Sequence, residues 1–164
     1  MKKADLSRYR VLAFATHGLV LSDLQGLDQS ALALANPQLA GDAENDGLLM
    51  LDEVLGLKLN ANWVVLSTCN TAGADGRGGE AISGLGRGFF FAGASSLLVS
   101  NWAVEMVSAR RLTTGLSRRQ TEQAGITRAE ALRQAMRDLM NDPAGQYRHP
   151  VFWAPFTLVG DGLL

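Results

Sequence analysis

Two side chains in this sequence, His17 and Cys69, are of the types that together perform nucleophilic catalysis. Each follows a short, continuously apolar run, Val11–Ala15 before the histidine and Trp63–Leu66 before the cysteine. Such runs are typical of buried strands in a parallel sheet. Neighbouring strands lie about 4.8 Å apart, so residues just beyond two adjacent parallel strands can face each other across a cleft. Imidazole, with an ordinary pKa near 6.5, can then take the proton of a thiol whose ordinary pKa is about 8.5.

Both residues also have a purely structural interpretation. A single cysteine is more often a small buried apolar side chain than a nucleophile, and a histidine beside a glycine is usually a turn residue. Cys69 differs because it lies between Thr68 and Asn70, at the polar end of its strand. A loop and a helix follow it, and backbone N–H groups there could hold an oxyanion. Because His17 and Cys69 each follow the end of a predicted strand, a catalytic pair is favoured over two structural residues. His149 lies in a loop context and is interpreted as structural.

The elements that must position this pair alternate between strands and helices. Apolar runs predict strands at Val11–Ala15, Trp63–Leu66, Ser96–Val99 and Phe156–Val159. Helical spacing of apolar residues predicts helices at Gly47–Leu57, Ile82–Ala92, Met106–Arg119 and Thr127–Met140, with Asp46 and Thr127 as N-caps and Pro143 ending the helical region. Turn formers between Leu19–Leu21 and Ala31–Leu34 predict a hairpin, and Asn36–Gly47 and Gly73–Gly79 are predicted loops. The pattern predicts one α/β domain over residues 1–164, with a mostly parallel sheet covered on both faces.

Composition excludes several classes of protein. The chain has 164 residues, of which 47% are hydrophobic and 19% charged, so it is expected to fold around a core. A net charge of −1 gives no electrostatic footprint for nucleic acid or an anionic membrane. One cysteine excludes an internal disulfide framework, and two distant histidines give no local zinc motif. With neither a signal-peptide core nor a membrane-length apolar stretch, we expect a cytoplasmic protein without metal or cofactor.

Two further patterns receive plain structural interpretations. Gly84-Leu85-Gly86-Arg87-Gly88 resembles part of a dinucleotide fingerprint, but it lacks the third glycine at the required spacing and falls within a predicted helix. These glycines are expected instead to let the helix pack close to the sheet. Several arginines are expected to lie on solvated helix faces: Arg110, Arg111, Arg118, Arg119, Arg128, Arg133 and Arg137.

The strand ends resemble those of a known family of proteins. Thr16-His17-Gly18 resembles the histidine turn of caspase-like cysteine peptidases, and Leu66-Ser67-Thr68-Cys69-Asn70-Thr71 resembles their nucleophile strand end. The closer resemblance is to the CHAT domain, a caspase-like, separase-related domain often attached to tetratricopeptide repeats. Its ordered segments run from about Tyr9 to Asp161: Asp46-Gly47-Leu48-Leu49, Gly79-Glu80, Gly84-Leu85-Gly86-Arg87, Phe91-Ala92-Gly93-Ala94, Ser100-Asn101-Trp102-Ala103-Val104, Ala129-Glu130-Ala131-Leu132-Arg133, His149-Pro150, Trp153-Ala154-Pro155-Phe156 and Val159-Gly160-Asp161.

The resemblance implies a caspase-like three-layer sandwich whose sheet is incomplete on its N-terminal side. It implies a cysteine endopeptidase in which His17 is the base and then the acid, and Cys69 is the nucleophile that forms a thioester. The backbone N–H groups of Gly18 and Cys69 would form the oxyanion hole. Substrate-binding positions would be Ser100, Asn101 and Trp102, with the strand end pairing with the substrate backbone.

Specificity and partners are also expectations of this resemblance. Acidic residues near the predicted cleft, namely Asp75, Glu80 and Glu105, would favour a basic residue before the scissile bond. The substrate would be a protein or peptide, and activation would come from a sensor or tetratricopeptide-repeat partner. The exposed sheet edge would associate with a missing N-terminal part of the domain or with a second copy. The alternative function is a catalytically silent interaction or oligomerisation module.

Overall fold

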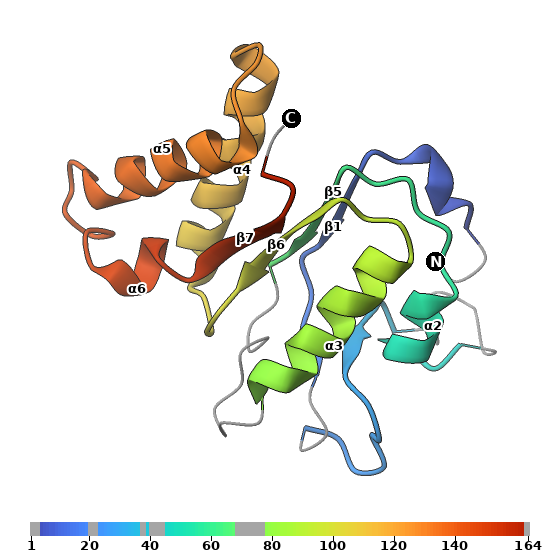
Figure 1. Ribbon diagram of the computed structural model, residues 1–164. Coiled ribbons are helices and arrows are strands. Elements are labelled where there is room, and N and C mark those ends of the chain that lie inside the picture. Colours follow the sequence, from blue (N-terminus) through green and yellow to red (C-terminus); the bar gives the residue numbers. More distant parts are fainter. Residues whose placement is uncertain (1–3, 20–22, 37–38, 40–44, 68–77, 163–164) are drawn as a thin grey trace.

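The computed structural model describes residues 4–19, 23–36, 39, 45–67 and 78–162, with side chains described from 84 onward in the last range. Figure 1 shows the arrangement of the elements. The strands are β1 (Val11–Phe14), β2 (Gly18–Leu19), β3 (Ala31–Ala33), β4 (Leu48–Met50), β5 (Trp63–Leu66), β6 (Ser96–Ser100) and β7 (Phe156–Gly160). The helices are the 3-10 turn η1 (Leu6–Arg8), α2 (Leu51–Leu55), α3 (Gly78–Phe91), α4 (Met106–Glu122), α5 (Arg128–Met140) and α6 (Pro150–Trp153).

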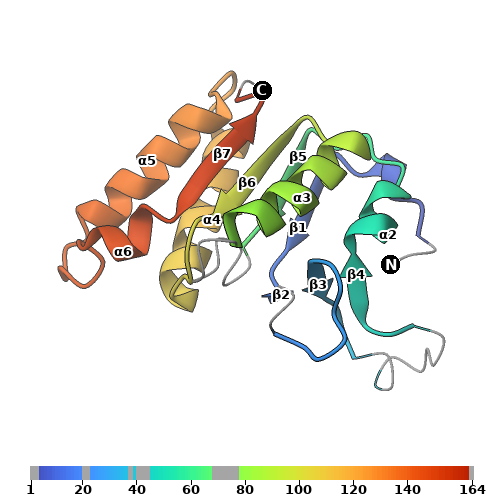
Figure 2. The same ribbon diagram turned by 60° about the horizontal axis from the view of Figure 1, so that its bottom comes forward.

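The central sheet has the strand order β1-β5-β6-β7, and its first three strands are parallel. Strand β7 pairs antiparallel with β6 and closes the other side of the sheet. A second, smaller antiparallel sheet has the order β2-β3-β4 and lies near the end of β1 (Figure 2). The predicted mostly parallel sheet is therefore confirmed. Of the hairpin predicted between Leu19–Leu21 and Ala31–Leu34, the structure shows Leu19 paired antiparallel with Ala31, and residues 20–21 lie outside the described residues.

Helices cover both faces of the central sheet, so the molecule is a three-layer sandwich (Figure 1). Alternate strand residues, such as Phe14 and Leu66, pack with Val54 of α2 and Phe89 of α3 in one core cluster. Residues that point the other way, such as Trp63, pack with α4, α5 and α6 in a second cluster. The two inner strands β5 and β6 are buried by this double cover, which explains why their central residues read as continuous hydrophobic runs.

Strand β1 is the exception to this double cover. It is a terminal strand of the central sheet, and its residues alternate between exposed and buried. Leu12 and Phe14 enter the first core cluster, whereas Val11 is 56% exposed. The other two parallel strands are paired on both sides, so the expected open sheet edge is at β1.

The helix predicted over Gly47–Leu57 is wrong in its first part. Residues Leu48–Met50 form strand β4, which pairs antiparallel with β3, and the helix is confined to Leu51–Leu55. Pairing with β3 overrides the local helical spacing, because Leu49 becomes fully buried in the strand. Asp46 accepts a 3.0 Å hydrogen bond from the Leu48 amide, as an N-cap residue would, but the residues that follow it form strand β4 and not a helix.

Other boundaries differ by a turn or less. Helix α3 begins at Gly78 rather than at Ile82, and α4 continues to Glu122. Thr127 caps α5 as predicted, accepting a 3.2 Å hydrogen bond from the Glu130 amide. The helical region does not end at Pro143, since α6 follows at Pro150–Trp153. The predicted loops at 36–47 and 73–79 lie largely outside the described residues.

Two arginines expected on solvated faces are in fact buried. Arg128 is 4% exposed, with its guanidinium 5.8 Å from the centre of the Trp63 ring and 3.3 Å from the Asp161 carbonyl oxygen. Burial lowers the pKa of this guanidinium, and the nearby Asp161 charge opposes that effect. Arg119, 8% exposed, is the second. The charge alone predicted exposure, but both side chains find aromatic or hydrogen-bonding partners that offset desolvation.

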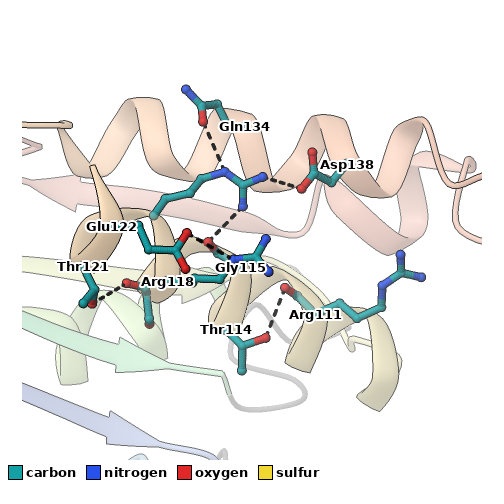
Figure 3. Close-up of polar contacts among 10 residues, drawn as sticks. Arg111, Thr114, Gly115, Arg118, Thr121, Glu122, Gln134 and Asp138 are labelled. Atoms are coloured by element: carbon teal, nitrogen blue, oxygen red, sulfur yellow. Dashed lines mark hydrogen bonds and ion pairs between the residues drawn. The ribbon is translucent and has the colours of Figure 1, made fainter. Parts of the chain in front are cut away.

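Arg119 joins α4 to α5. Its guanidinium donates to Gln134 Oε1 at 3.2 Å and to the Gly115 carbonyl at 2.9 Å, and it forms an ion pair with Asp138 (Figure 3). Gly115 belongs to α4 itself, whereas Gln134 and Asp138 belong to α5. The side chain therefore links the two helices that cover one face of the sheet.

Replacing Arg119 by methionine should lower the free energy of unfolding by about 2 kcal/mol, because its hydrogen bonds are lost and two of the acceptors, on Gly115 and Gln134, stay partly buried. The control is Arg118→Met, since the Arg118 guanidinium lies on the surface 3.8 Å from Glu122. That change should cost less than about 0.5 kcal/mol. Urea denaturation measures both, and equal losses in the two variants would contradict this account of the helix contact.

Candidate active site

The carboxyl ends of three parallel strands lie side by side at one end of the central sheet. Phe14 of β1 is aligned with Leu66 of β5, and Leu66 is aligned with Val99 of β6. The Ser67 amide donates a 3.2 Å hydrogen bond to the Phe14 carbonyl, which ties the first two strand ends together. The segments that begin at Ala15, Ser67 and Ser100 therefore leave the sheet side by side, where ligands bind in open α/β sheets.

The turn that carries His17 is held by the small sheet. The Thr16 hydroxyl donates to the Ala33 carbonyl, and the Ala33 amide donates a 2.8 Å hydrogen bond to the His17 carbonyl. These contacts fix the backbone on either side of the histidine, while the His17 residue itself is exposed. Thr16 is a positioning residue that the sequence analysis missed, although a hydroxyl residue between a buried strand and a histidine is a visible signal.

Gly18 follows as a buried residue of β2, opposite Leu32 of β3. Because the Ala33 amide bonds to the His17 carbonyl, Gly18 and Leu32 are a non-hydrogen-bonded pair of this antiparallel ladder. The N–H of Gly18 consequently points away from β3. The pairing with β3 thus leaves this N–H without a partner on β3, and a backbone oxyanion donor needs an N–H that the sheet does not use.

Three of the candidate residues have side chains outside the described part of the structure. Cys69 lies outside the described residues, as does Asp75. Glu80 is in the first turn of α3, but its side chain is also outside the described part of the structure. The contact between His17 and Cys69 is therefore a prediction from the strand register.

The segment Ser100–Trp102 continues from β6 and is anchored to the end of the sandwich near β7. Ser100 is 1% exposed and is aligned with Phe156 of β7. The Asn101 amide donates to the Pro155 carbonyl at 2.7 Å, and its side chain donates to the Thr157 hydroxyl at 2.7 Å. Trp102 is 39% exposed, and its indole N–H lies 3.3 Å from the Val151 carbonyl. Of these three residues, Asn101 and Trp102 present surface to solvent.

Glu105 has a defined structural task at the N-terminus of α4. Its carboxylate oxygens accept hydrogen bonds from the amides of Val107 at 2.8 Å and Ser108 at 2.7 Å. These backbone hydrogen bonds lower the pKa of Glu105 below its ordinary value of 4.5, so the carboxylate is ionised at neutral pH. The exposed side chain thus adds a fixed negative charge just after Trp102, at the positive end of a helix dipole.

His149 also has a structural task, as the sequence predicted. It precedes α6, and its Nδ1 accepts a 3.2 Å hydrogen bond from the Val151 amide. Pro150 stands at the first position of that helix, where its missing N–H costs nothing. This histidine caps a helix that packs on the opposite side of the sandwich from β1 (Figure 1).

The fold and the strand-end site define a mixed α/β sandwich of the caspase-like type. The model of the CHAT domain matches residues 1–161, and the chain therefore belongs to the CHAT domain family, which is related to caspase-like peptidases. No curated protein matches the chain. Within the part of the chain that the structure describes, no helix is both long enough and apolar enough to cross a membrane.

Proposed function

We propose that this protein is a cysteine endopeptidase that uses His17 and Cys69 as a catalytic dyad. The observation that carries the proposal is the register of β1 and β5. Phe14 and Leu66 are aligned, and His17 and Cys69 stand at the third position after each of them. Equal offsets from aligned residues of adjacent parallel strands favour an approach of the two side chains at the sheet edge.

The reaction would proceed by transfer of the Cys69 proton to the His17 imidazole and attack of the thiolate on the scissile carbonyl. The tetrahedral oxyanion would accept hydrogen bonds from the N–H groups of Gly18 and Cys69, and the orientation of the Gly18 N–H supports this role. Collapse to a thioester releases the amine, which takes the proton from the imidazolium. Water then hydrolyses the thioester, with His17 acting again as the base.

The substrate is proposed to be a polypeptide with a basic residue before the scissile bond. The exposed segment at Asn101 and Trp102 follows a strand end, where an extended peptide can pair with the backbone. The ionised carboxylate of Glu105 supplies negative charge close to this segment, and Glu80 lies in the helix that follows the nucleophile loop. A sensor or tetratricopeptide-repeat partner is the proposed activator.

Fluorogenic peptides that end in arginine, aspartate or leucine test both the reaction and the specificity. We expect arginine-ended peptides to have the highest kcat/KM, because a guanidinium would be attracted by the acidic residues around the cleft. Turnover without a preference for arginine would overturn the specificity. No turnover of any peptide, together with a Cys69 thiol that alkylates as slowly as an ordinary thiol, would contradict the endopeptidase. Glu105→Gln should retain one of the two cap hydrogen bonds through its amide oxygen, and removal of the negative charge should lower the preference for arginine.

The open edge of β1 favours a second candidate function, a catalytically silent module for association. An active enzyme and a silent module differ in the chemistry of Cys69. A catalytic cysteine beside a histidine has a depressed pKa and reacts rapidly with alkylating agents, whereas a structural cysteine is inert.

A further inference from the structure

The backbone of β1 presents unpaired hydrogen-bonding groups on one side. The carbonyls of Arg10 and Phe14 accept hydrogen bonds from the amides of Trp63 and Ser67 on β5. Because these directions alternate along a strand, the N–H and carbonyl groups of Val11 and Ala13 point away from β5. Among the described strands, none pairs with that edge.

The open edge belongs to a short strand of four residues whose sequence contains no feature that blocks pairing. No charged residue, proline or bulge interrupts Val11–Phe14, and such an edge is a template for pairing with another strand. Tyr9 and Val11 are each 56% exposed. A groove of about 470 Å³ is lined by residues of β1 and the turn after it, Leu12–Thr16, together with Ala33–Ala35. Most of its lining is apolar, and four of its residues are alanines.

We propose that β1 pairs antiparallel with β1 of a second copy of this chain, which joins two central sheets into one. In the favoured register, Val11 lies opposite the Ala13 position of the second copy, and Tyr9 lies opposite the Ala15 position. Each large exposed side chain then meets an alanine, and every outward backbone group of Val11 and Ala13 gains a partner. In this register Leu12 lies opposite the Leu12 position of the second copy, so the two-fold axis passes between these two positions. The contact of Val11 with the Ala13 position therefore occurs twice.

The distribution of charge is compatible with this pairing. Arg8 and Arg10 are exposed at the start of β1, and no charged residue follows until after His17. An antiparallel arrangement places Arg10 opposite the Phe14 position and Arg8 opposite the Thr16 position. Like charges are therefore not opposed, whereas a parallel arrangement in register would align the two arginine pairs.

The other terminal strand is less suited to such an interface. Strand β7 ends in Gly160, which has a φ of +94°, a left-handed conformation that departs from the extended backbone needed for continued pairing. Its exposed Val159 therefore provides a matched control position, since it is 41% exposed on a terminal strand.

The mass of the wild-type chain in solution, measured by light scattering and analytical ultracentrifugation, tests the proposal. We expect a dimer. The double variant Val11→Lys/Ala13→Lys places lysine opposite lysine twice and should weaken the dimer by at least about tenfold. In Val11→Lys/Ala13→Glu, opposite charges meet in the same register and the dimer should be retained. Val159→Lys should also leave the dimer intact, and circular dichroism confirms that each variant is folded.

Several results would overturn the proposal. A monomeric wild-type chain at all concentrations excludes pairing with a second copy and leaves the edge for a different strand. A dimer that Val159→Lys dissociates has its interface at β7. A dimer that survives the double lysine variant as well as the lysine–glutamate variant does not use this edge or this register. None of these outcomes depends on peptidase activity, so they are distinct from a failure of the proposed function.

Discussion

Replacing Cys69 by serine lowers kcat/KM for peptide hydrolysis by at least about 10³-fold if the dyad operates as proposed. A serine hydroxyl is a much weaker nucleophile than a thiolate, and His17 in a site built for an ion pair cannot ionise it to a useful extent. Steady-state hydrolysis of the arginine-ended fluorogenic peptide measures the loss. The variant should keep the melting temperature of the wild type within a few degrees, because the change is nearly isosteric.

The two histidines of the chain provide the matched comparison for this experiment. His17→Ala should lose activity to a similar extent, and the double variant with Cys69→Ser should lose little more, since the two groups act as one unit. His149→Ala removes only the cap of α6. It should cost about 1 kcal/mol of stability and leave kcat/KM unchanged at temperatures well below unfolding. Equal losses in the two histidine variants would contradict the assignment of His17 as the base.

Replacing Phe89 by alanine should lower the free energy of unfolding by about 3–5 kcal/mol, because truncating a buried phenylalanine leaves a cavity. Phe89 is fully buried on α3, and its ring centre lies 5.4 Å from that of Phe14. Phe14 ends β1 immediately before the turn that carries His17. The contact thus packs α3 against the strand that positions the candidate base. Urea denaturation at constant m-value measures the loss.

The control for this substitution stands two residues further along the same helix. Phe91 is 79% exposed, and Phe91→Ala should change the free energy of unfolding by less than about 0.5 kcal/mol. Phe89→Leu should lose less than Phe89→Ala, since it preserves most of the buried volume. Similar losses for Phe89→Ala and Phe91→Ala would show that the core cluster does not depend on this ring.

The sequence allowed the central sheet to be predicted because all four strands are mainly apolar and the inner two, β5 and β6, are buried on both faces. Trp63–Leu66 is a strand with the predicted bounds, and its alignment with β1 follows from the parallel order. Strand β4 could not be predicted in the same way. Leu48 fits the helical spacing of Leu51, Val54 and Leu55, and only pairing with β3, which is distant in sequence, makes Leu48–Met50 a strand. Long-range contacts of this kind leave no local pattern.

Charged side chains were the second source of error. Arg119 and Arg128 lie on helices whose other arginines are exposed, and charge alone predicts that they are solvated. Their burial depends on partners from other elements, namely Asp138 on α5 for Arg119 and Trp63 on β5 for Arg128. Such partners become visible only when the helices are packed against each other and against the sheet.

The arrangement of strand ends around the candidate site could be predicted from the sequence, whereas the hydrogen bonds that hold its backbone could not. The strand ends bring the His17 turn and the Ser100–Trp102 segment to the same edge as the residues after Leu66, as expected for parallel strands. The roles of Thr16 and Glu105 in holding local backbone were not predicted. Both depend on hydrogen bonds whose partners are fixed by the folded chain, at the Ala33 carbonyl and at the first amides of α4.

The pH dependence of Cys69 alkylation by iodoacetamide, in the wild type and in His17→Ala, tests the central claim most directly. Cys69 is the single cysteine of the chain, so the reaction reports on one thiol. A formed dyad predicts rapid alkylation below pH 7 in the wild type, with a rate that falls in His17→Ala because the thiolate loses its imidazolium partner. Slow alkylation in both proteins, with a midpoint near or above the ordinary thiol pKa of about 8.5, would contradict the dyad and favour the silent module.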